Sequence, residues 1–270
     1  MDVIASIILG FVQGITEFLP ISSTGHLILT ESILDFSGEG TGLAFDAVLH
    51  LATALAVVVY FFDDIRTLVR AVLRKMGRLP VDAADLTLAY ALMVGTIPAV
   101  VFGMLLESYM ESLFRNPLLV AGVLFLGSLL FIVGEYYYQN HTQQDRLRVR
   151  TGFTIGLFQA LALFPGMSRS GATIVGGMFC GLSRSAATRF AFLLAVPVIL
   201  GAGAKKVLDL LSLDTAISWG PIVLGAVAAF VVGLLAIRFM LGFVRRYTLW
   251  PFIWYRIILS VVIVFVVFFG

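Results

Sequence analysis

The sequence predicts an all-α integral membrane protein built as an inverted repeat, with one re-entrant helical hairpin and three transmembrane helices in each half. Three observations lead to this prediction. Of the 270 residues, 60% are apolar and 13% are charged, a charged fraction about half that of typical soluble domains. Several apolar runs reach the roughly 20 residues that a membrane-spanning helix requires. Two regions with matching polar motifs interrupt the apolar pattern.

The first element is an apolar region over residues 3 to 34, which a polar segment around Pro20 interrupts. Each part is too short to cross the membrane as a single helix. Non-helical polar backbone at membrane depth is tolerated only where protein buries it or where it lines a cavity. We therefore expect a re-entrant hairpin whose turn lies inside the membrane.

Six apolar runs between charged or Pro/Gly breaks predict transmembrane helices. They cover residues 43 to 62, 84 to 106, 117 to 138, 186 to 204, 219 to 241 and 250 to 269. A second interrupted region, residues 152 to 182, lies between the third run and the fourth. We expect it to form another re-entrant hairpin for the same reason.

The two halves of the chain resemble each other in sequence. Gly-Phe-Val-Gln-Gly at residues 10 to 14 matches Gly-Leu-Phe-Gln-Ala at residues 156 to 160, and further on Gly95 matches Gly225. Each match is followed by similar breaks in the apolar pattern. The chain therefore contains an internal repeat.

We predict a single membrane domain over residues 1 to 270, in which the first repeat covers residues 1 to 138 and the second covers residues 152 to 270. One hairpin and three crossings make an odd number of crossings. The second repeat must then start from the opposite side of the membrane, as it does in many transporters.

The distribution of basic residues predicts the orientation. Lys and Arg are concentrated around residues 66 to 78 and 146 to 150 and in the pair Arg245 and Arg246, so the positive-inside rule places these segments in the cytoplasm. Both chain termini are then expected outside, and the turns of the two hairpins are expected to meet near the middle of the membrane. The net charge of +2 is too small to suggest nucleic-acid binding.

Polar side chains cluster in the first hairpin. Gln13 and Glu17 lie four residues apart and so share one helix face. The second half-helix opens with hydroxyl residues that can cap it: Ser22, Ser23 and Thr24. Its free N–H groups and positive dipole end form an anion site. His26 lies in the first turn and shares a face with Ser23, three residues earlier.

The second hairpin repeats this hydroxyl-rich helix start and adds a positive charge. Its hydroxyl residues are Ser168, Ser170 and Thr173. The planar guanidinium of Arg169 can bind two phosphate oxygens at once. Two helix N-termini would then converge on one polyanion.

Two structural alternatives stay open. Small hydroxyl residues ease helix packing in membranes, which would be enough to explain Ser22, Ser32 or Ser170. Glu17 and Arg169 could form a structural ion pair. However, a charge at the bilayer centre costs at least about 2.5 to 3.5 kcal/mol, so a pair with no other role is a costly way to join two hairpins.

Other polar residues in the apolar runs have simpler explanations. His50 is expected to be a packed or interfacial histidine. Glu135 is expected in an interfacial belt with the tyrosines that follow it, and Arg184 and Arg189 are expected to be anchors at the cytoplasmic surface.

Residues 13 to 26, Gln-Gly-Ile-Thr-Glu-Phe-Leu-Pro-Ile-Ser-Ser-Thr-Gly-His, and residues 165 to 173, Pro-Gly-Met-Ser-Arg-Ser-Gly-Ala-Thr, resemble the two signatures of the bacitracin-resistance family of undecaprenyl-diphosphate phosphatases. The resemblance covers essentially the whole chain. It implies a bacterial plasma-membrane enzyme that hydrolyses undecaprenyl diphosphate to the monophosphate and recycles this lipid carrier for cell-wall synthesis. Bacitracin resistance would follow, because the drug binds the diphosphate.

The resemblance also implies which residues form the site. The acidic pair of the family falls on Gln13 and Glu17, and its Ser and His fall on Ser23 and His26. Its Pro-Gly-x-Ser-Arg-Ser signature falls on residues 165 to 170. Many members have Glu where this chain has Gln13, which leaves Glu17 as the one carboxylate of the pair.

Hydrolysis of a diphosphate requires positive charge, an in-line nucleophile and a shielded leaving phosphate. Arg169, two helix dipoles and a divalent cation, Mg²⁺ or Ca²⁺, bound by Glu17 would supply the charge. We expect Ser23 or a water as the nucleophile and His26 as the general acid/base. The other expected substrate-binding residues are Gln13, Ser22, Thr24, Ser168, Ser170 and Thr173.

A transporter is the competing class, because inverted repeats with re-entrant hairpins are a transporter architecture. The same fold could move a polyprenyl phosphate lipid across the membrane. A transporter needs no nucleophile, so Ser23 and His26 beside Arg169 favour the enzyme. The expected partners are the polyprenyl diphosphate substrate and membrane lipids, with a homodimer as one open assembly and no nucleic acid.

Overall fold

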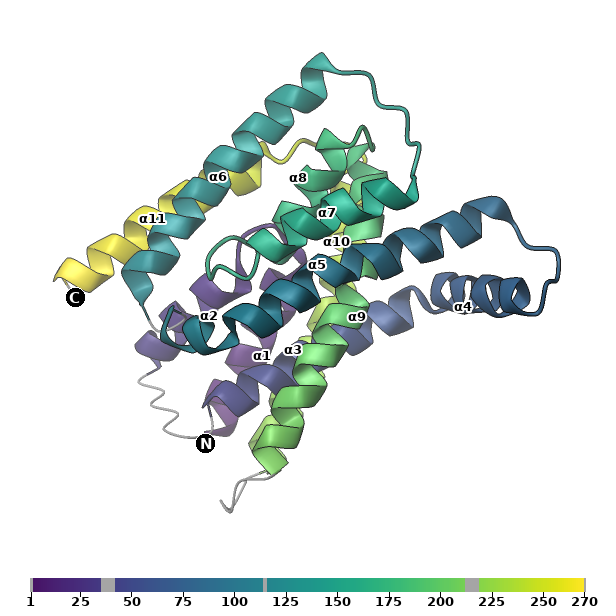
Figure 1. Cartoon of the computed structure of the whole chain (residues 1–270). Helices are drawn as coiled ribbons and strands as arrows, with labels where there is room; N and C mark the ends of the chain where they lie inside the picture. The colour runs from purple at the N-terminus through teal and green to yellow at the C-terminus, as the bar shows by residue number, and fades with distance from the viewer. Residues whose placement is uncertain (1, 35–41, 114–115, 212–218, 270) are drawn as a thin grey trace.

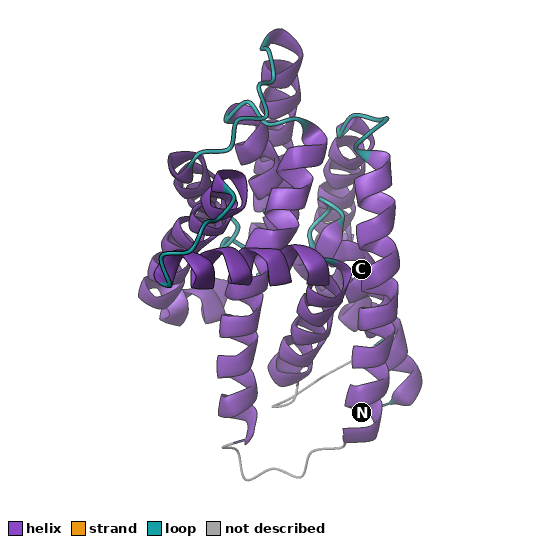
Figure 2. Cartoon of the chain, turned by 90° about the vertical axis from the view of Figure 1, so that its right-hand side faces the viewer, coloured by secondary structure: helices purple, strands orange, loops and turns teal. Residues whose placement is uncertain are grey.

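A computed structural model describes residues 2–34, 42–113, 116–211 and 219–269, and within these ranges every regular element is a helix (Figures 1 and 2). The helices are α1 (Val3–Phe18), α2 (Ser23–Ile33), α3 (Gly42–Tyr60), α4 (Phe62–Met76), α5 (Ala83–Leu113), α6 (Pro117–Asn140), α7 (Val149–Leu161), α8 (Arg169–Phe179), α9 (Arg184–Leu211), α10 (Trp219–Phe243) and α11 (Trp250–Phe269).

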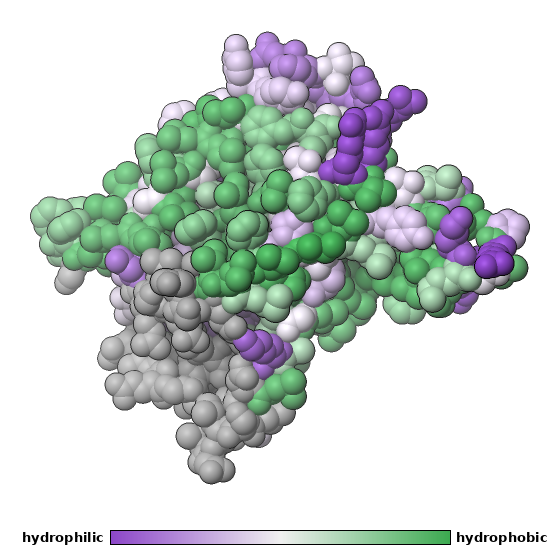
Figure 3. All heavy atoms as spheres, viewed as in Figure 1, coloured by the Kyte–Doolittle hydropathy of each residue, from purple (hydrophilic) through white to green (hydrophobic). Residues whose placement is uncertain are grey.

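The long helices match the predicted spans. In the described part of the chain, α5, α6, α9, α10 and α11 are each long and apolar enough to cross a membrane, and α3 forms a sixth span if it is counted together with α4. Large apolar side chains such as Leu235 and Val261 are more than 60% exposed, and apolar side chains dominate the face in Figure 3. The predicted fold class, an all-α integral membrane protein, is confirmed.

Helix α4 differs from the prediction, which treated the basic segment after residue 62 as a loop. It is a helix that bends by 77° away from α3. Leu68 and Ala71 are buried on one side, where α4 packs against α5 (Figure 1). Asp63 and Asp64 in the first turn, and basic residues in the last, complement the helix dipole.

Both predicted hairpins are present as pairs of short helices, α1–α2 and α7–α8. The second helix of each pair begins after a serine in the left-handed backbone region, Ser22 with φ 74° and Ser168 with φ 71°. A non-glycine residue is uncommon in this region. The serine hydroxyls compensate, because they accept hydrogen bonds from the N–H groups of Gly25 and Gly171 and cap the two helices.

The two halves interlock, because each hairpin packs against a helix of the other half. Helix α1 lies along α10, and α7 lies along α5. Gly10 approaches the carbonyl oxygen of Gly225, and its sequence counterpart Gly156 approaches that of Gly95. A methyl group at either glycine would collide with backbone, and small residues allow this close approach in membranes.

The remaining helices pair with their own counterparts, α3 with α9 and α6 with α11. The helix contacts are therefore symmetric between the two halves, which exchange their hairpins, as the predicted inverted repeat requires. The boundaries of the two repeats, residues 1 to 138 and 152 to 270, stay a prediction.

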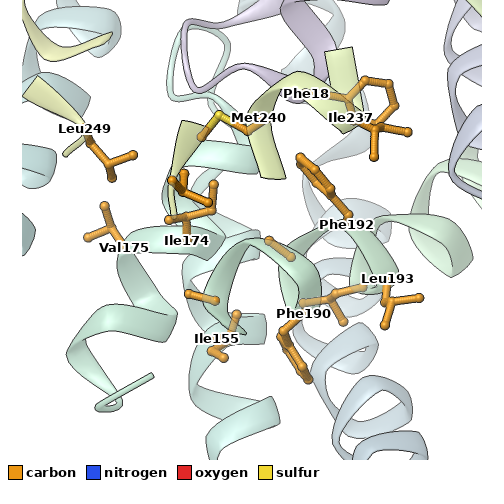
Figure 4. Packing of buried hydrophobic residues seen from close by; sticks show 14 of the residues in the cluster. Phe18, Ile155, Ile174, Val175, Phe190, Phe192, Leu193, Ile237, Met240 and Leu249 are labelled. Atoms are coloured by element: carbon orange, nitrogen blue, oxygen red, sulfur yellow. The ribbon is translucent and has the colours of Figure 1, made fainter. Parts of the chain in front are cut away.

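The largest buried apolar cluster lies where α1, α8, α9 and α10 meet (Figure 4). Phe18, directly after Glu17, meets the ring of Phe192 edge to face with centroids 5.4 Å apart. Ile237 and Met240 of α10 belong to the same cluster. The cluster fixes the end of α1 and so the position of the neighbouring carboxylate.

Candidate active site

The carboxylate of Glu17 is the centre of a buried polar cluster. Its Oε1 accepts a hydrogen bond of 2.8 Å from Nη2 of Arg169. Its Oε2 accepts hydrogen bonds of 3.0 Å from the amide of Gln13 and 3.0 Å from the hydroxyl of Ser23. The Nε2 atom of His50 lies 3.6 Å from the same oxygen. Only 6% of Glu17 is exposed, so four side chains from α1, α2, α3 and α8 converge on one carboxylate.

Local sequence explains this convergence. Gln13 and Glu17 lie on one face of α1, and the turn after that helix brings the chain back so that Ser23 starts α2 beside them. Arg169 starts α8 in the same way. Equivalent positions of the two hairpins thus bind the two oxygens of Glu17, one with a hydroxyl and one with a guanidinium. The N-termini of two helices point into the same region, as the sequence predicts.

Two buried polar atoms at this centre have no partner among the described residues, Nη1 of Arg169 and Oε1 of Gln13. A buried polar group without a hydrogen bond is unfavourable. Nη1 is a cationic donor and would bind an anionic oxygen. The Oε1 atom of Gln13 is an acceptor and would bind a hydroxyl, a water or a metal cation. Both atoms therefore suit a phosphate group or its cation.

The side chains at this centre could bind a divalent cation only if the substrate supplied further ligands. No group of three His, Cys, Asp or Glu side chains in the described residues could hold a metal. Mg²⁺ is usually bound by one or two carboxylates together with substrate phosphates and waters. Glu17 and the free Oε1 of Gln13 meet the protein's part of that requirement.

Most hydroxyl groups of the second hairpin bind protein atoms. Ser168 caps α8 and lies 3.2 Å from the hydroxyl of Ser170. Ser170 donates a hydrogen bond of 3.2 Å to the carbonyl of Leu19 in the first hairpin. Thr173 donates to the carbonyls of Arg169 and Ser170. Ser170 thus joins the two turns beside the site, while Ser168 and Thr173 bind atoms within the second hairpin.

Ser22 and Thr24 lie on either side of Ser23. Ser22 is buried and caps α2. Thr24 is half-buried, and in the described part of the chain its hydroxyl makes no hydrogen bond. Thr24 is therefore the freer of the two hydroxyl groups.

The ring of His26 is turned away from Ser23, although the two residues share a helix face. Its Nδ1 lies 2.7 Å from the carbonyl oxygen of Ser22. Its Nε2 lies 2.7 Å from the hydroxyl of Tyr255 in α11. The hydroxyl of Ser23 donates to Glu17 instead. Tyr255 was not expected from the sequence, where it is one of several aromatic residues in an apolar run.

Arg256, the next residue in α11, joins the two hairpin turns. Its guanidinium donates to the carbonyls of Pro20 in the first turn, at 3.5 Å, and of Gly166 in the second, at 3.2 Å. It also donates to the carbonyl of Leu124 and the hydroxyl of Ser128. The side chain is fully buried, and no carboxylate pairs with it in the described residues. The sequence motifs did not predict a role for Arg256, although a charged residue in a long apolar run usually faces the interior of a membrane protein.

Two other polar residues have contacts that the sequence did not indicate. The Nε2 atom of His50, which was expected to be a packed or interfacial histidine, lies 3.6 Å from a carboxylate oxygen of Glu17. Glu135 is fully buried and pairs with Arg184 through both carboxylate oxygens, while it also accepts from the N–H of Leu249. Hydropathy alone assigns a residue near a helix end to the interface, but here Arg184 and the backbone of Leu249 bind it inside the protein.

Arg189 also pairs with a neighbouring helix, because it donates to the carboxylate of Asp64 in α4. About half of its side chain is exposed. The expected anchor at the surface is thus also a contact between α9 and α4.

Comparison with known proteins gives a consistent result. The family model for the bacitracin resistance protein BacA matches residues 6–262. A protein of Alteromonas mediterranea named undecaprenyl-diphosphatase is 40% identical over 268 residues, which is 99% of this chain and 100% of that protein. Proteins with the same name are 41% identical in Acinetobacter baumannii, over 97% of this chain and 94% of that protein, and 38% identical in Marinobacter nauticus, over 97% and 98%.

Proposed function

We propose that this chain, which belongs to the bacitracin resistance protein BacA family, hydrolyses undecaprenyl diphosphate to undecaprenyl phosphate and phosphate. It is a membrane-embedded undecaprenyl-diphosphatase, a hydrolase of a phosphoric anhydride. The reaction regenerates the lipid carrier of cell-wall synthesis and gives bacitracin resistance. The observation that carries the proposal is the buried cluster around Glu17, in which Ser23 and Arg169 bind the same carboxylate.

Arg169 binds the terminal phosphate in this proposal. Its Nη2 is held by Glu17, which leaves Nη1 free and oriented by the planar guanidinium. The N-termini of α2 and α8 add backbone N–H groups and positive dipole ends. Donors fixed in advance in a site without water stabilise the charge that develops in the transition state.

Ser23, or a water in its place, attacks the terminal phosphorus. The hydroxyl of Ser23 already donates to Glu17 at 3.0 Å, so its proton passes to that carboxylate as the new P–O bond forms. The bond to the bridging oxygen breaks, and undecaprenyl phosphate leaves with the electron pair. Where Ser23 is the nucleophile, a water then attacks the phosphorus of the phosphoserine, the Ser23 O–P bond breaks, and phosphate leaves as Ser23 regains its proton. His26, in the first turn of α2, acts as the general acid/base for the attacking water, because the proton of Ser23 passes to Glu17.

A divalent cation, Mg²⁺ or Ca²⁺, is part of the proposal. Glu17 would hold it together with the free Oε1 of Gln13 and with phosphate oxygens of the substrate. Bound there, it would neutralise phosphate charge. The replacement of a second carboxylate by Gln13 makes the protein's own share of the ligands small, so the cation would enter with the diphosphate.

The remaining hydroxyl groups position the substrate in this proposal. Thr24 has a free hydroxyl at the start of α2 and would bind a phosphate oxygen directly. The others, Ser22, Ser168, Ser170 and Thr173, keep the helix N-termini in place through their hydrogen bonds to the turns. Their contribution to binding is then to orient backbone N–H groups.

Both chain termini lie outside in the proposed orientation, and the basic face of α4 lies in the cytoplasm. The supporting observation is that the exposed Arg66, Arg70 and Arg74 follow one another at helical spacing. The enzyme spans the plasma membrane of a bacterium. A homodimer stays a prediction. The mass of the purified protein in detergent would test it.

A lipid transporter is the second candidate, and the exchanged hairpins of the inverted repeat favour it. The two functions separate in detergent, where no compartments exist. Purified protein is incubated with undecaprenyl diphosphate, and released phosphate is measured. The enzyme releases phosphate under these conditions. Protein that is folded but releases none, with or without a divalent cation, would contradict the proposed hydrolysis and leave transport.

A further inference from the structure

The hydrogen bonds of His26 determine which ring nitrogen carries the proton in the neutral ring. Nδ1 lies 2.7 Å from the carbonyl oxygen of Ser22, and a carbonyl oxygen can only accept. Nδ1 must therefore carry the hydrogen and donate it. The lone pair of the neutral imidazole is then on Nε2, which accepts from the hydroxyl of Tyr255 at 2.7 Å.

Tyr255 reaches His26 from a distant part of the chain. It belongs to α11, and its ring stacks on the imidazole with a centroid distance of 5.5 Å and an interplanar angle of 3°. The neighbouring Arg256 binds the turns of both hairpins. Arg256 thus fixes α11 against the turns, and Tyr255 fixes it against His26.

The hydroxyl of Tyr255 retains accepting capacity while it donates to Nε2. The side chain is 44% exposed, so the hydroxyl is not enclosed by protein on all sides. A proton that arrives at Nε2 reverses this hydrogen bond, so that the imidazolium N–H donates to the phenol oxygen. No bond to carbon or phosphorus changes in this step, and the proton stays on the imidazole.

We propose that Tyr255 is a positioning residue for the proposed diphosphate hydrolysis, because it holds the imidazole of His26 with the basic Nε2 directed toward α11. The inference rests on the proposed function and on the role of His26 in it. It adds a residue that neither signature motif contains. Through this pair, α11 controls the orientation of the general acid/base on α2.

The test is the steady-state kinetics of Tyr255→Phe, which removes one hydroxyl and keeps the ring. A general acid/base typically increases the reaction rate by about 100- to 10,000-fold. A misplaced general acid/base loses part of this increase. We expect kcat to fall by roughly tenfold or more, with KM changed by less than about twofold, because the ground-state contacts of the substrate stay the same. Tyr136→Phe, the same change on the exposed surface of α6, is the matched control and should keep wild-type kinetics.

The second part of the test places Tyr255→Phe in the His26→Ala background. If Tyr255 acts through His26, the double variant loses no further activity relative to His26→Ala alone, since groups that act as a unit are not additive. A purely structural role of Tyr255 would lower activity in both backgrounds. The melting temperature of each variant in detergent identifies any loss of folding.

The outcomes separate this inference from the proposed function. Wild-type protein that releases no phosphate contradicts the function itself. Wild-type activity with an inactive His26→Ala variant, and with Tyr255→Phe at wild-type kcat, overturns only the role of Tyr255. A loss in Tyr255→Phe that appears in KM alone, or that is as large without His26, also overturns it.

Discussion

At the scale of single residues, the two hairpins have similar backbones but different chemistry. The position of Ser23 is occupied by Arg169 in the second hairpin, and that of His26 by Ala172. Leu163 stands where the first hairpin has Glu17. One carboxylate therefore binds residues of both hairpins, and we expect one reaction centre instead of two.

Arg169→Lys tests the phosphate clamp. Lysine keeps the charge but not the planar fork, so it cannot bind Glu17 and a phosphate oxygen in the observed arrangement. We expect kcat/KM to fall by about 100-fold or more, measured as phosphate release from undecaprenyl diphosphate. Arg189→Lys, in a surface ion pair, is the matched control and should be near wild type. Near-normal turnover of Arg169→Lys would remove Arg169 from the site.

Chelation tests the cation. We expect a chelator to abolish phosphate release and added Mg²⁺ or Ca²⁺ to restore it. Glu17→Gln should lose this response, because it leaves two neutral amides, with Gln13 as the other, and no carboxylate in the cluster. Binding of the cation to wild type and to Glu17→Gln in the presence of substrate gives a readout apart from activity. Phosphate release that a chelator does not change would leave Arg169 and the helix N-termini as the only stabilisers of charge.

At the scale of elements, the helix arrangement is stabilised by close packing between helices rather than by the hydrophobic effect. Lipid is as apolar as the side chains it contacts, so helices in membranes are held by tight packing. The paired contacts of Gly10 with Gly225 and of Gly156 with Gly95 place helix backbones against each other. The same contact occurs twice because the halves are related by the inverted repeat.

Gly10→Ala is expected to destabilise the protein by about 1 to 3 kcal/mol, the typical cost of overpacking a tight interface. Its methyl group would meet the backbone of Gly225, which cannot move without shifting α10. Gly156→Ala should have a similar effect. Gly122→Ala is the control, because nothing lies within 4 Å of a side chain added there. Thermal unfolding in detergent measures all three, and equal melting temperatures for Gly10→Ala and Gly122→Ala would refute the packing argument.

Arg256→Met is expected to separate the two hairpin turns. The change leaves the buried carbonyls of Pro20, Gly166 and Leu124 without this donor, and a buried polar group left unpaired costs about 1 to 3 kcal/mol. We expect a melting temperature well below that of wild type and a large loss of phosphate release. Arg256→Lys should recover part of the stability, since it restores one donor. A methionine variant with wild-type stability and activity would show that the turns do not depend on Arg256.

At the scale of the whole molecule, a second set of contacts joins distant segments away from the hairpin turns. The loop near Asp145 binds the turn at Gly181 and Ser183, and Glu135 joins Arg184 to Leu249. We expect this end of the molecule to face the cytoplasm, because the basic residues 146 to 150 and the pair Arg245 and Arg246 lie beside these contacts in the sequence. The start of α10 is separated from this end by the length of an apolar helix, so we expect it on the opposite side of the membrane.

The orientation is tested with single cysteines in a Cys180→Ser background, which removes the native thiol. His141→Cys at the end of α6 should be shielded from a membrane-impermeant thiol reagent in intact cells. Gly220→Cys at the start of α10 should react, because that position is open and lies on the other side. Disrupted cells provide the control, in which both positions should react. Labelling of both from outside in intact cells would contradict the inverted repeat.

The sequence by itself determined the all-α membrane fold, the long apolar helices and the two pairs of short helices. Its motifs also contain Gln13, Ser23 and Arg169, which the structure places around Glu17. It could do so because these features depend on local order: apolar length, helix breaks, and spacings such as Gln13 to Glu17 within one helix. The orientation and the repeat limits stay predictions from the same patterns.

Only the tertiary structure decided which residues of α3 and α11 join the site. His50, Tyr255 and Arg256 lie in apolar helices with no motif around them, and they meet Glu17, His26 and the hairpin turns only after the helices pack. The pairing of Glu135 with Arg184 has the same origin. The physical reason is that hydropathy and helical spacing act along the chain, whereas these hydrogen bonds join segments whose approach is set by the packing of both halves.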